Sequence, residues 1–192
     1  MSARSRHRLN LVQAAAKLFR KQGYARTGLN DILAESRAPK GSLYHSFPGG
    51  KEQLGEEALR FSATLAADTL TALRQEHRTA PAVLLAFAER LAGWMEASAF
   101  QDGCPLATTI LETVPRSAAM TTAAREGFSA WRAVFEEALL DDGAKCDDAR
   151  RLAGLTISVL EGALIQARVE LSTQPIMESA QDVAHLMAMR SA

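Results

Sequence analysis

The chain has 192 residues, of which 47% are hydrophobic and 6% aromatic, so it is long enough to bury a core and has the Ala- and Leu-rich composition common in helical proteins. The formal net charge is 0, yet residues 1–50 hold nine Lys/Arg against two Asp/Glu, a balance of +7, which leaves −7 for the remainder. A basic segment joined to an acidic body predicts a polyanionic partner for the first part alone. The chain has no uninterrupted apolar run of about 18 residues and no apolar stretch after its first basic residues, so we expect a cytoplasmic protein without a membrane partner.

The first predicted helix covers residues 4–22. Leu9, Val12 and Phe19 lie on one face of it, and Gly23 ends it because glycine adopts the left-handed conformation without a side-chain penalty. A second, short helix follows, with Leu29, Ile32 and Leu33 at the i, i+3 and i+4 spacing of a buried stripe.

A turn and another short helix come next. Pro39 suits the first position of a helix, so residues 36–38 become the turn and the new helix begins at Pro39 or Lys40. Leu43 and Phe47 are expected to face inward. The outward side chains are small at the start of the helix and then able to donate hydrogen bonds, as a helix needs in order to lie in a DNA major groove. Those outward residues are Lys40, Gly41, Ser42, Tyr44 and His45.

These residues resemble the DNA-binding signature of the TetR family of one-component repressors, and the run from Ala38 to Leu54 is similar to its LmrA/YxaF-like branch. The matching positions are Gly23-Tyr24, Thr27-Gly28, Asp31-Ile32, the run Lys40–His45, Phe47-Pro48 and Lys51-Glu52. The resemblance implies an all-α fold with a helix-turn-helix DNA-binding domain at 1–50 and a helical effector-binding and dimerisation domain at 51–192. It also implies a homodimeric repressor that binds a palindromic operator in double-stranded DNA and is released by a small molecule.

Ten residues are predicted to form the DNA-contacting surface. Arg37, Lys40 and Ser42 are candidates for base edges or nearby groups, and Thr27, Tyr44, His45 and Lys51 are candidates for phosphates. Gly28, Pro39 and Gly41 complete the set. Arg37 departs from the glycine usual in this turn of the family, which predicts backbone strain of about 1 kcal/mol together with an added charge beside the groove.

The body is expected to contain six further helices, of which the last two have more apolar surface than one chain can cover. Those two helices would pair with the same two of a second chain, although a larger monomeric core is the alternative interpretation. The predicted spans are 50–78, from Pro81 to about 97, from Pro105 to 114, 117–140, from an N-cap at Asp147 or Asp148 to 172, and from Pro175 onward.

A cavity between these helices is predicted to bind a hydrophobic or aromatic effector, with two polar side chains as anchors. Its candidate residues are Phe61, Leu65, Leu91, Trp94, Met95, Leu106, Ile110, Phe128, Trp131, Leu160, Glu161, Leu164 and Arg168. Trp94 and Trp131 are the strongest candidates. Plain core packing is the competing interpretation for every one of them.

The sequence contains no GxGxxG, P-loop, HExxH or GxSxG motif, and its four histidines have no metal-ligand spacing, so we predict no catalytic residue, metal or cofactor. Cys104 and Cys146 are isolated. An alternative function is thiol-based redox sensing by Cys104, whose pKa the adjoining helix start would lower. A third interpretation is a helical scaffold whose basic end binds an acidic protein or a membrane.

Overall fold

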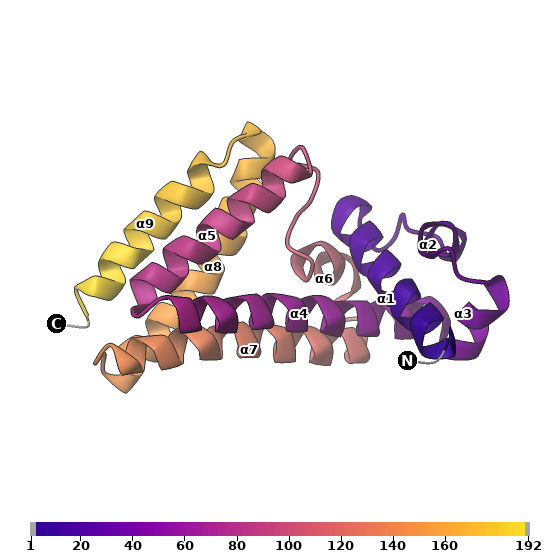
Figure 1. Ribbon diagram of the computed structural model, residues 1–192, viewed down its shortest axis with the longest axis horizontal. Helices are drawn as coiled ribbons and strands as arrows, with labels where there is room; N and C mark the ends of the chain where they lie inside the picture. The colour runs from indigo at the N-terminus through magenta and orange to yellow at the C-terminus, as the bar shows by residue number, and fades with distance from the viewer. Residues whose placement is uncertain (1–2, 191–192) are drawn as a thin grey trace. The chain divides into compact units, whose positions relative to one another are not determined.

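The computed structural model describes residues 3–190, and this part of the chain is all-α, with nine helices and no strand (Figure 1). The predicted fold class is confirmed. The helices are α1 (Ala3–Gln22), α2 (Leu29–Ser36), α3 (Lys40–Ser46), α4 (Gly50–Glu76), α5 (Ala80–Ala97), α6 (Ala107–Thr113), α7 (Ala118–Asp141), α8 (Cys146–Glu170) and α9 (Gln174–Ala188).

Most predicted boundaries lie within two residues of the observed ones. Gly23 has φ +85°, the left-handed backbone expected after α1, and Pro81 and Pro175 lie in the first turns of α5 and α9. The predicted N-cap of α8 is wrong. Lys145 occupies the N-cap, and Asp147 and Asp148 lie in the first turn, where carboxylates interact favourably with the helix dipole.

The chain forms two compact units, and both α4 and α7 begin in the first unit and end in the second. The first unit comprises residues up to Thr64 together with Cys104–Gly127, and the second comprises Leu65–Gly103 together with the residues from Phe128 on. The head, which comprises α1, α2 and α3, therefore packs as one body with the start of α4, with α6 and with the start of α7. The predicted functional boundary between residues 50 and 51 stays a prediction.

The core of the first unit is formed where α1 packs against α2 and α3. Its fully buried side chains are Leu11, Phe19, Ile32, Leu43, Phe47 and Leu54. An exposed ion pair joins α1 to α2, with Lys17 Nζ 2.6 Å from Glu35 Oε1. Helix α6 also packs against α1.

Two glycines allow α4 and α7 to approach closely within this unit. A Cβ at Gly55 would overlap the methyl group of Met120 and lie 2.9 Å from the Tyr24 ring. A Cβ at Gly127 would lie 2.8 Å from Ala63 and 2.9 Å from Leu106. All of these distances are shorter than ordinary van der Waals contact. Glycine is therefore required at positions 55 and 127 by the close spacing of the helices rather than by its backbone angle.

In the second unit, α9 packs against both α5 and α8. Arg74 joins α4 to α7 through ion pairs of 2.5 Å with Glu137 and with Asp141. At the start of α5, the Ala80 N–H donates to Asp142 at 2.7 Å. The hydrogen-bonded carboxylates hold the pKa of Arg74 above its usual value, with Asp141 as the larger cause.

Helix α8 is long and apolar enough to cross a membrane by length and composition. One face of it packs within the second unit, where Ala153, Ile157, Leu160 and Ala167 are buried. A single such helix with a buried face is what the core of a helical protein contains.

Candidate nucleic-acid interface

The turn between α2 and α3 is fixed by local hydrogen bonds. The Ser36 hydroxyl donates to Leu33 O at 3.1 Å and accepts the Ala38 N–H at 3.2 Å, which ties the end of α2 to the residues before α3. Between them, Arg37 has φ 53° and ψ 24°, the left-handed conformation expected from the glycine usual at this place. The backbone thus has the geometry of a helix-turn-helix although the side chain is arginine.

The side chains of α3 that the sequence predicts to face outward are exposed, apart from the half-buried Ser42. Lys40, Gly41, Tyr44 and His45 are exposed, and a Cβ at Gly41 would meet no atom within 4 Å. Ser42 is half-buried, and its hydroxyl donates to Pro39 O at 2.6 Å. With its proton used in this way, the Ser42 oxygen keeps its capacity as an acceptor, which suits an amino group on a base edge.

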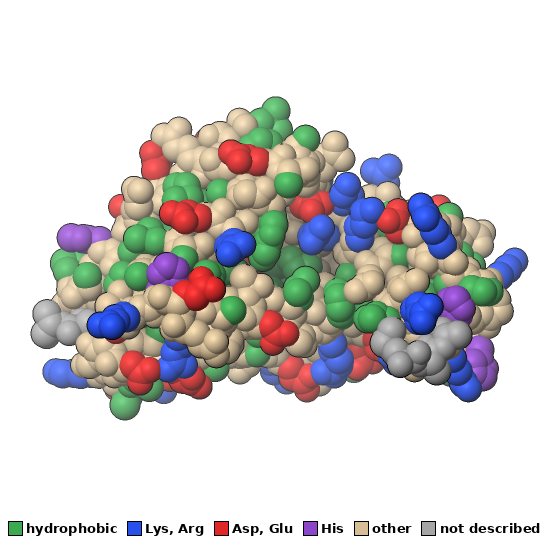
Figure 2. All heavy atoms as spheres, viewed as in Figure 1, with side chains coloured by type: hydrophobic (Ala, Val, Ile, Leu, Met, Phe, Trp, Pro, Cys, Tyr) green, Lys and Arg blue, Asp and Glu red, His purple; other side chains and the backbone are tan. Residues whose placement is uncertain are grey.

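The surface over α1 to α3 carries scattered Lys and Arg side chains, as Figure 2 shows for one face. Arg4, Arg6, Arg26, Arg37 and Lys40 are exposed members of this set. Such a distribution supplies the electrostatic attraction that nearly all duplex-binding surfaces need.

Thr27, expected to hold a phosphate, instead lies within the head. Its side chain is fully buried, donates to Gly23 O at 2.7 Å and accepts from Gln22 Nε2 at 3.2 Å. Thr27 therefore shapes the turn that precedes α2. The neighbouring Gly28 is exposed, and its N–H donates to Asp31 Oδ2 at 2.9 Å, which caps the start of α2.

Lys51, at the start of α4, is held against the turn between α1 and α2. Its Nζ lies 4.3 Å from the centroid of the Tyr24 ring and donates to Ala25 O at 3.4 Å. Burial lowers the pKa of Lys51, and the carboxylate of Glu112 acts in the opposite direction. Burial likewise raises the pKa of the Tyr24 phenol, with a smaller contribution from Glu52.

The arginines at the start of α1 divide into free and engaged groups. Arg8 forms an ion pair with Glu57 of α4 and lies 5.3 Å from the centroid of the Phe47 ring. These contacts connect α1 to the C-cap residue of α3 and to α4. Arg4 and Arg6 are exposed at the same end of the helix.

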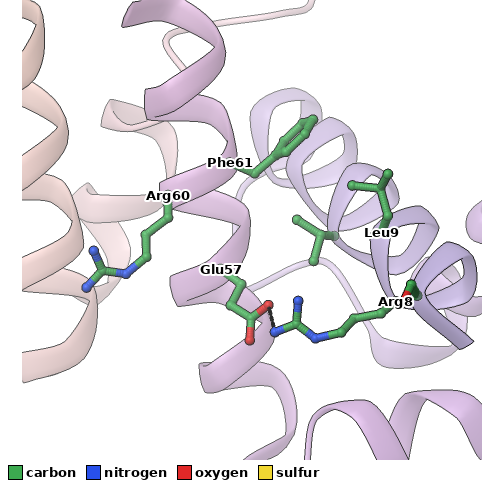
Figure 3. A pocket seen from close by; sticks show the side chains of 7 residues that line it. Arg8, Leu9, Glu57, Arg60 and Phe61 are labelled. Atoms are coloured by element: carbon green, nitrogen blue, oxygen red, sulfur yellow. Dashed lines mark ion pairs between the residues drawn. The ribbon is translucent and has the colours of Figure 1, made fainter. Parts of the chain in front are cut away.

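A surface pocket of about 410 Å³ lies between α1 and α4 (Figure 3). Leu9, Val12 and Phe61 supply its apolar wall, and the Arg8–Glu57 pair lies across one side. Arg60, although it lines the pocket, extends toward α7, where it pairs with Glu126. Of the predicted effector-binding residues, this pocket contains Phe61.

The other predicted effector-binding residues fall into different environments. Leu65, Trp94 and Arg168 are exposed, the first two by 53% and 45%. Leu91, Ile110, Phe128 and Glu161 are half-buried, and the fully or nearly fully buried members are Met95, Leu106, Trp131, Leu160 and Leu164. Phe61, Leu106 and Ile110 belong to the first unit and the remainder to the second.

Aromatic contacts connect some of these side chains to the core of the second unit. Trp131 meets Phe128 edge to face at 5.4 Å, and Trp94 meets Phe87 at 6.5 Å. Trp94 is thus partly exposed with one edge against a buried ring, a position from which it can contact a ligand.

Two family models match the chain. Residues 11–58 match the model for bacterial regulatory proteins of the tetR family, and residues 80–182 match the C-terminal domain of LmrA/YxaF-like transcriptional regulators. The chain belongs to the TetR family. It is a DNA-binding transcriptional regulator, and like other members of this family it is not an enzyme.

Individual relatives agree with this assignment over nearly the whole chain. The HTH-type regulator LmrA of Bacillus subtilis is 32% identical over 185 residues, covering 94% of this chain and 96% of its own. The uncharacterized HTH-type regulator YxaF of the same organism is 30% identical over 187 residues, covering 97% and 98%. A crystal structure of a TetR regulator from Chloroflexus aurantiacus has a TM-score of 0.83 at 25% identity, with 99% and 98% of the chains covered.

The structure shows that three further residues support the candidate interface from behind, in roles that the sequence pattern did not give them. Ser36 fixes the turn, Gly55 sets the spacing between α4 and α7, and Glu112 of α6 accepts the Ala25 N–H at 2.5 Å. Ser36 had a local signal, since serine near a helix end often bonds to the backbone. Gly55 and Glu112 act on residues far away in the sequence, which gives no local signal.

Proposed function

We propose that this protein is a cytoplasmic, ligand-responsive repressor that binds a palindromic operator as a homodimer and leaves it when a small hydrophobic effector binds. The observation that carries the proposal is the open outer face of α3, on a head whose turn geometry is that of a helix-turn-helix. The contacts to DNA proposed for this face are Arg37, Lys40, Ser42, Tyr44 and His45, with Gly28, Pro39 and Gly41 permitting close approach. Thr27 and Lys51 contribute by shaping the turn before α2 and the start of α4.

Dimerisation through α8 and α9 is supported by an apolar stripe that the single chain leaves uncovered. On α8, Leu155, Ile165 and Val169 are exposed by 41%, 61% and 79%. They follow the i+3/i+4 spacing of one helix face, with Ser158 and Gly162 between them. Leu186 of α9 and Met189, the C-cap residue after it, are also exposed. Exposed apolar faces of this kind mark interaction surfaces, and a two-fold pairing would form a four-helix interface.

The dimer is what makes the head specific for a site. Two recognition helices related by a two-fold axis read two half-sites about 34 Å apart, one helical turn of DNA. An effector then acts by favouring a dimer whose heads have another spacing, which requires that it binds that state more tightly than the DNA-bound state. Trp94 and Trp131 remain the residues we expect an aromatic effector to contact.

The test begins with selection of binding sites from a random duplex library, followed by measurement of affinity at several salt concentrations. We expect the selected sequence to be an inverted repeat. We also expect Lys40→Ala to weaken binding and to reduce the slope of log affinity against log salt by about 2, since each dimer loses one cation from each head. Recovery of no common sequence, or equal affinity for a shuffled duplex, would contradict the proposal.

The alternative is a redox regulator that uses Cys104. Its thiol lies just before α6, where the Ala107 N–H is 3.5 Å from Sγ, and the side chain is 6% exposed. Burial restricts the access of an oxidant to this sulfur. If Cys104→Ser retains the whole response of DNA binding to peroxide, the alternative is excluded.

A further inference from the structure

The turn between α1 and α2 is held by charged side chains from two helices that are distant in sequence. The Ala25 N–H donates to Glu112 Oε2 of α6 at 2.5 Å, and the Ala25 carbonyl accepts from Lys51 of α4 at 3.4 Å. Both polar groups of this backbone residue are thus satisfied from outside the turn. Ala25 is separated from Glu112 by 87 positions.

Glu112 also occupies the space beside Gly23. A Cβ at Gly23 would lie 2.5 Å from Glu112 Oε1, and Gly23 has φ +85°. Glycine is therefore required here for its backbone angle and for the room it leaves to the carboxylate. One side chain of α6 consequently contacts the turn at two residues.

The residues on this turn lead directly to the helix-turn-helix. Thr27, whose hydroxyl donates to Gly23 O at 2.7 Å, joins the turn to α2, and Gly28 is the N-cap of α2. A change in the turn therefore changes the direction in which α2 leaves α1, and with it the place of α3. Charge-assisted hydrogen bonds are about twice as strong as neutral ones, so the Glu112 contact can fix this geometry.

We propose that Glu112 is a positioning residue for DNA binding: without touching DNA, it fixes the turn between α1 and α2 through Ala25 and Lys51, and so sets the direction in which α2 leads to the recognition helix. The inference rests on the proposed binding of a specific duplex. Lys51 adds independent support, because it stacks on Tyr24 and loses hydration there, and the carboxylate of Glu112 favours its charged form.

Three variants test this assignment. Glu112→Ala removes the acceptor and the charge, whereas Glu112→Gln keeps an oxygen for the Ala25 N–H and removes the charge alone. Glu126→Ala is the matched control, since Glu126 belongs to the same unit and forms an ion pair with Arg60 away from the turn. Each full-length protein is titrated with the library-selected duplex and with a shuffled duplex at one salt concentration. Exchange of the Ala25 amide and the Lys51 side-chain pKa are followed by NMR.

We expect Glu112→Ala to lose at least about tenfold in affinity for the selected duplex, with a salt slope like that of the wild type because no phosphate contact is removed. The Ala25 amide should exchange faster. In Glu112→Gln the amide should stay protected while the Lys51 pKa falls, and the loss of affinity should be smaller. Rescue by Gln separates positioning from general destabilisation, and it also gives a folded variant if Glu112→Ala does not fold.

The proposal is overturned if Glu112→Ala binds within about twofold of the wild type, or if Glu126→Ala loses as much affinity. An Ala25 amide that stays protected in Glu112→Ala also overturns it. If the wild type itself prefers no duplex over a shuffled one, the proposed function has failed, and the amide and pKa measurements still report whether Glu112 holds the turn.

Discussion

Gly162 lies in the middle of the uncovered stripe on α8, and replacing it with leucine should have opposite effects in a dimer and in a monomer. A Cβ at this glycine would meet no atom within 4 Å of the single chain. In a monomer, Gly162→Leu should therefore be harmless, and it should stabilise α8 by about 1 kcal/mol because leucine favours helix over glycine. In the proposed dimer, the same side chain would enter the interface between two closely packed helices.

The expected cost in the dimer follows from the two-fold symmetry. Inserting a bulky group into a packed interface costs about 1–3 kcal/mol, and each dimer contains the substitution twice, so dimerisation weakens by about 2–6 kcal/mol. That range corresponds to a dissociation constant raised by about 30-fold to about 10⁴-fold. Sedimentation equilibrium over a wide range of protein concentration measures the constant directly.

Gly93 of α5 provides the matched control. It is exposed, and a Cβ there also meets no atom within 4 Å, but it lies on another helix than the stripe. Gly93→Leu should gain the same helix propensity and leave the dimer unchanged. A Gly162→Leu protein that dimerises as tightly as the wild type would refute the assignment of this face of α8 to the interface.

Three further predictions concern the first unit. Gly55→Ala should destabilise the folded protein by about 1–3 kcal/mol in chemical denaturation, because the added methyl group overlaps the fully buried Met120 and also meets the Tyr24 ring at 2.9 Å, so both side chains must shift; unchanged stability would show that these neighbours give way at little cost. The raised pKa of Tyr24 means that the folded state holds the phenol proton more tightly than the unfolded state, so the contribution of Tyr24 to stability should be fully present below pH 10.0 and be lost as the pH rises through the folded pKa; in a Tyr44→Phe background, where Tyr24 is the remaining tyrosine, near-ultraviolet absorbance should show a midpoint above that of free tyrosine. Arg37→Gly should raise stability by about 1 kcal/mol by relieving the left-handed backbone, and should weaken operator binding with a smaller salt slope; unchanged affinity and slope would exclude a DNA contact by Arg37.

The elements of this fold were predictable because their limits are set by nearby residues. Gly23 ends α1 through its own backbone angle, and Pro39, Pro81 and Pro175 mark helix starts through the missing N–H and the fixed φ. The left-handed conformation of Arg37 could be expected from the family pattern of the turn. The N-cap of α8 was missed because Lys145 carries no capping side chain, while the aspartates that suggested a cap act within the first turn.

The environment of individual side chains was less predictable. The Thr27 side chain is of a kind that can bind phosphate, but its hydroxyl is used within the turn. The ion pair of Arg8 with Glu57 of α4 gives no local signal in the sequence. Glu112 reaches Ala25 across 87 positions. Contacts of this kind depend on how helices pack, which local periodicity does not encode. The environment of the predicted effector residues could not be predicted for the same reason, since an apolar helix face can line either a core or a cavity.

The spacing of the two half-sites tests the central claim most directly. Once an operator has been selected, inserting about five base pairs at its centre rotates one half-site to the opposite face of the duplex while leaving every base contact available. If two α3 helices of one dimer read the site together, affinity at fixed salt should fall toward the non-specific level, a loss of about 10³-fold or more. Affinity that survives the insertion unchanged would show that the heads bind independently, and would contradict the account of a dimeric regulator.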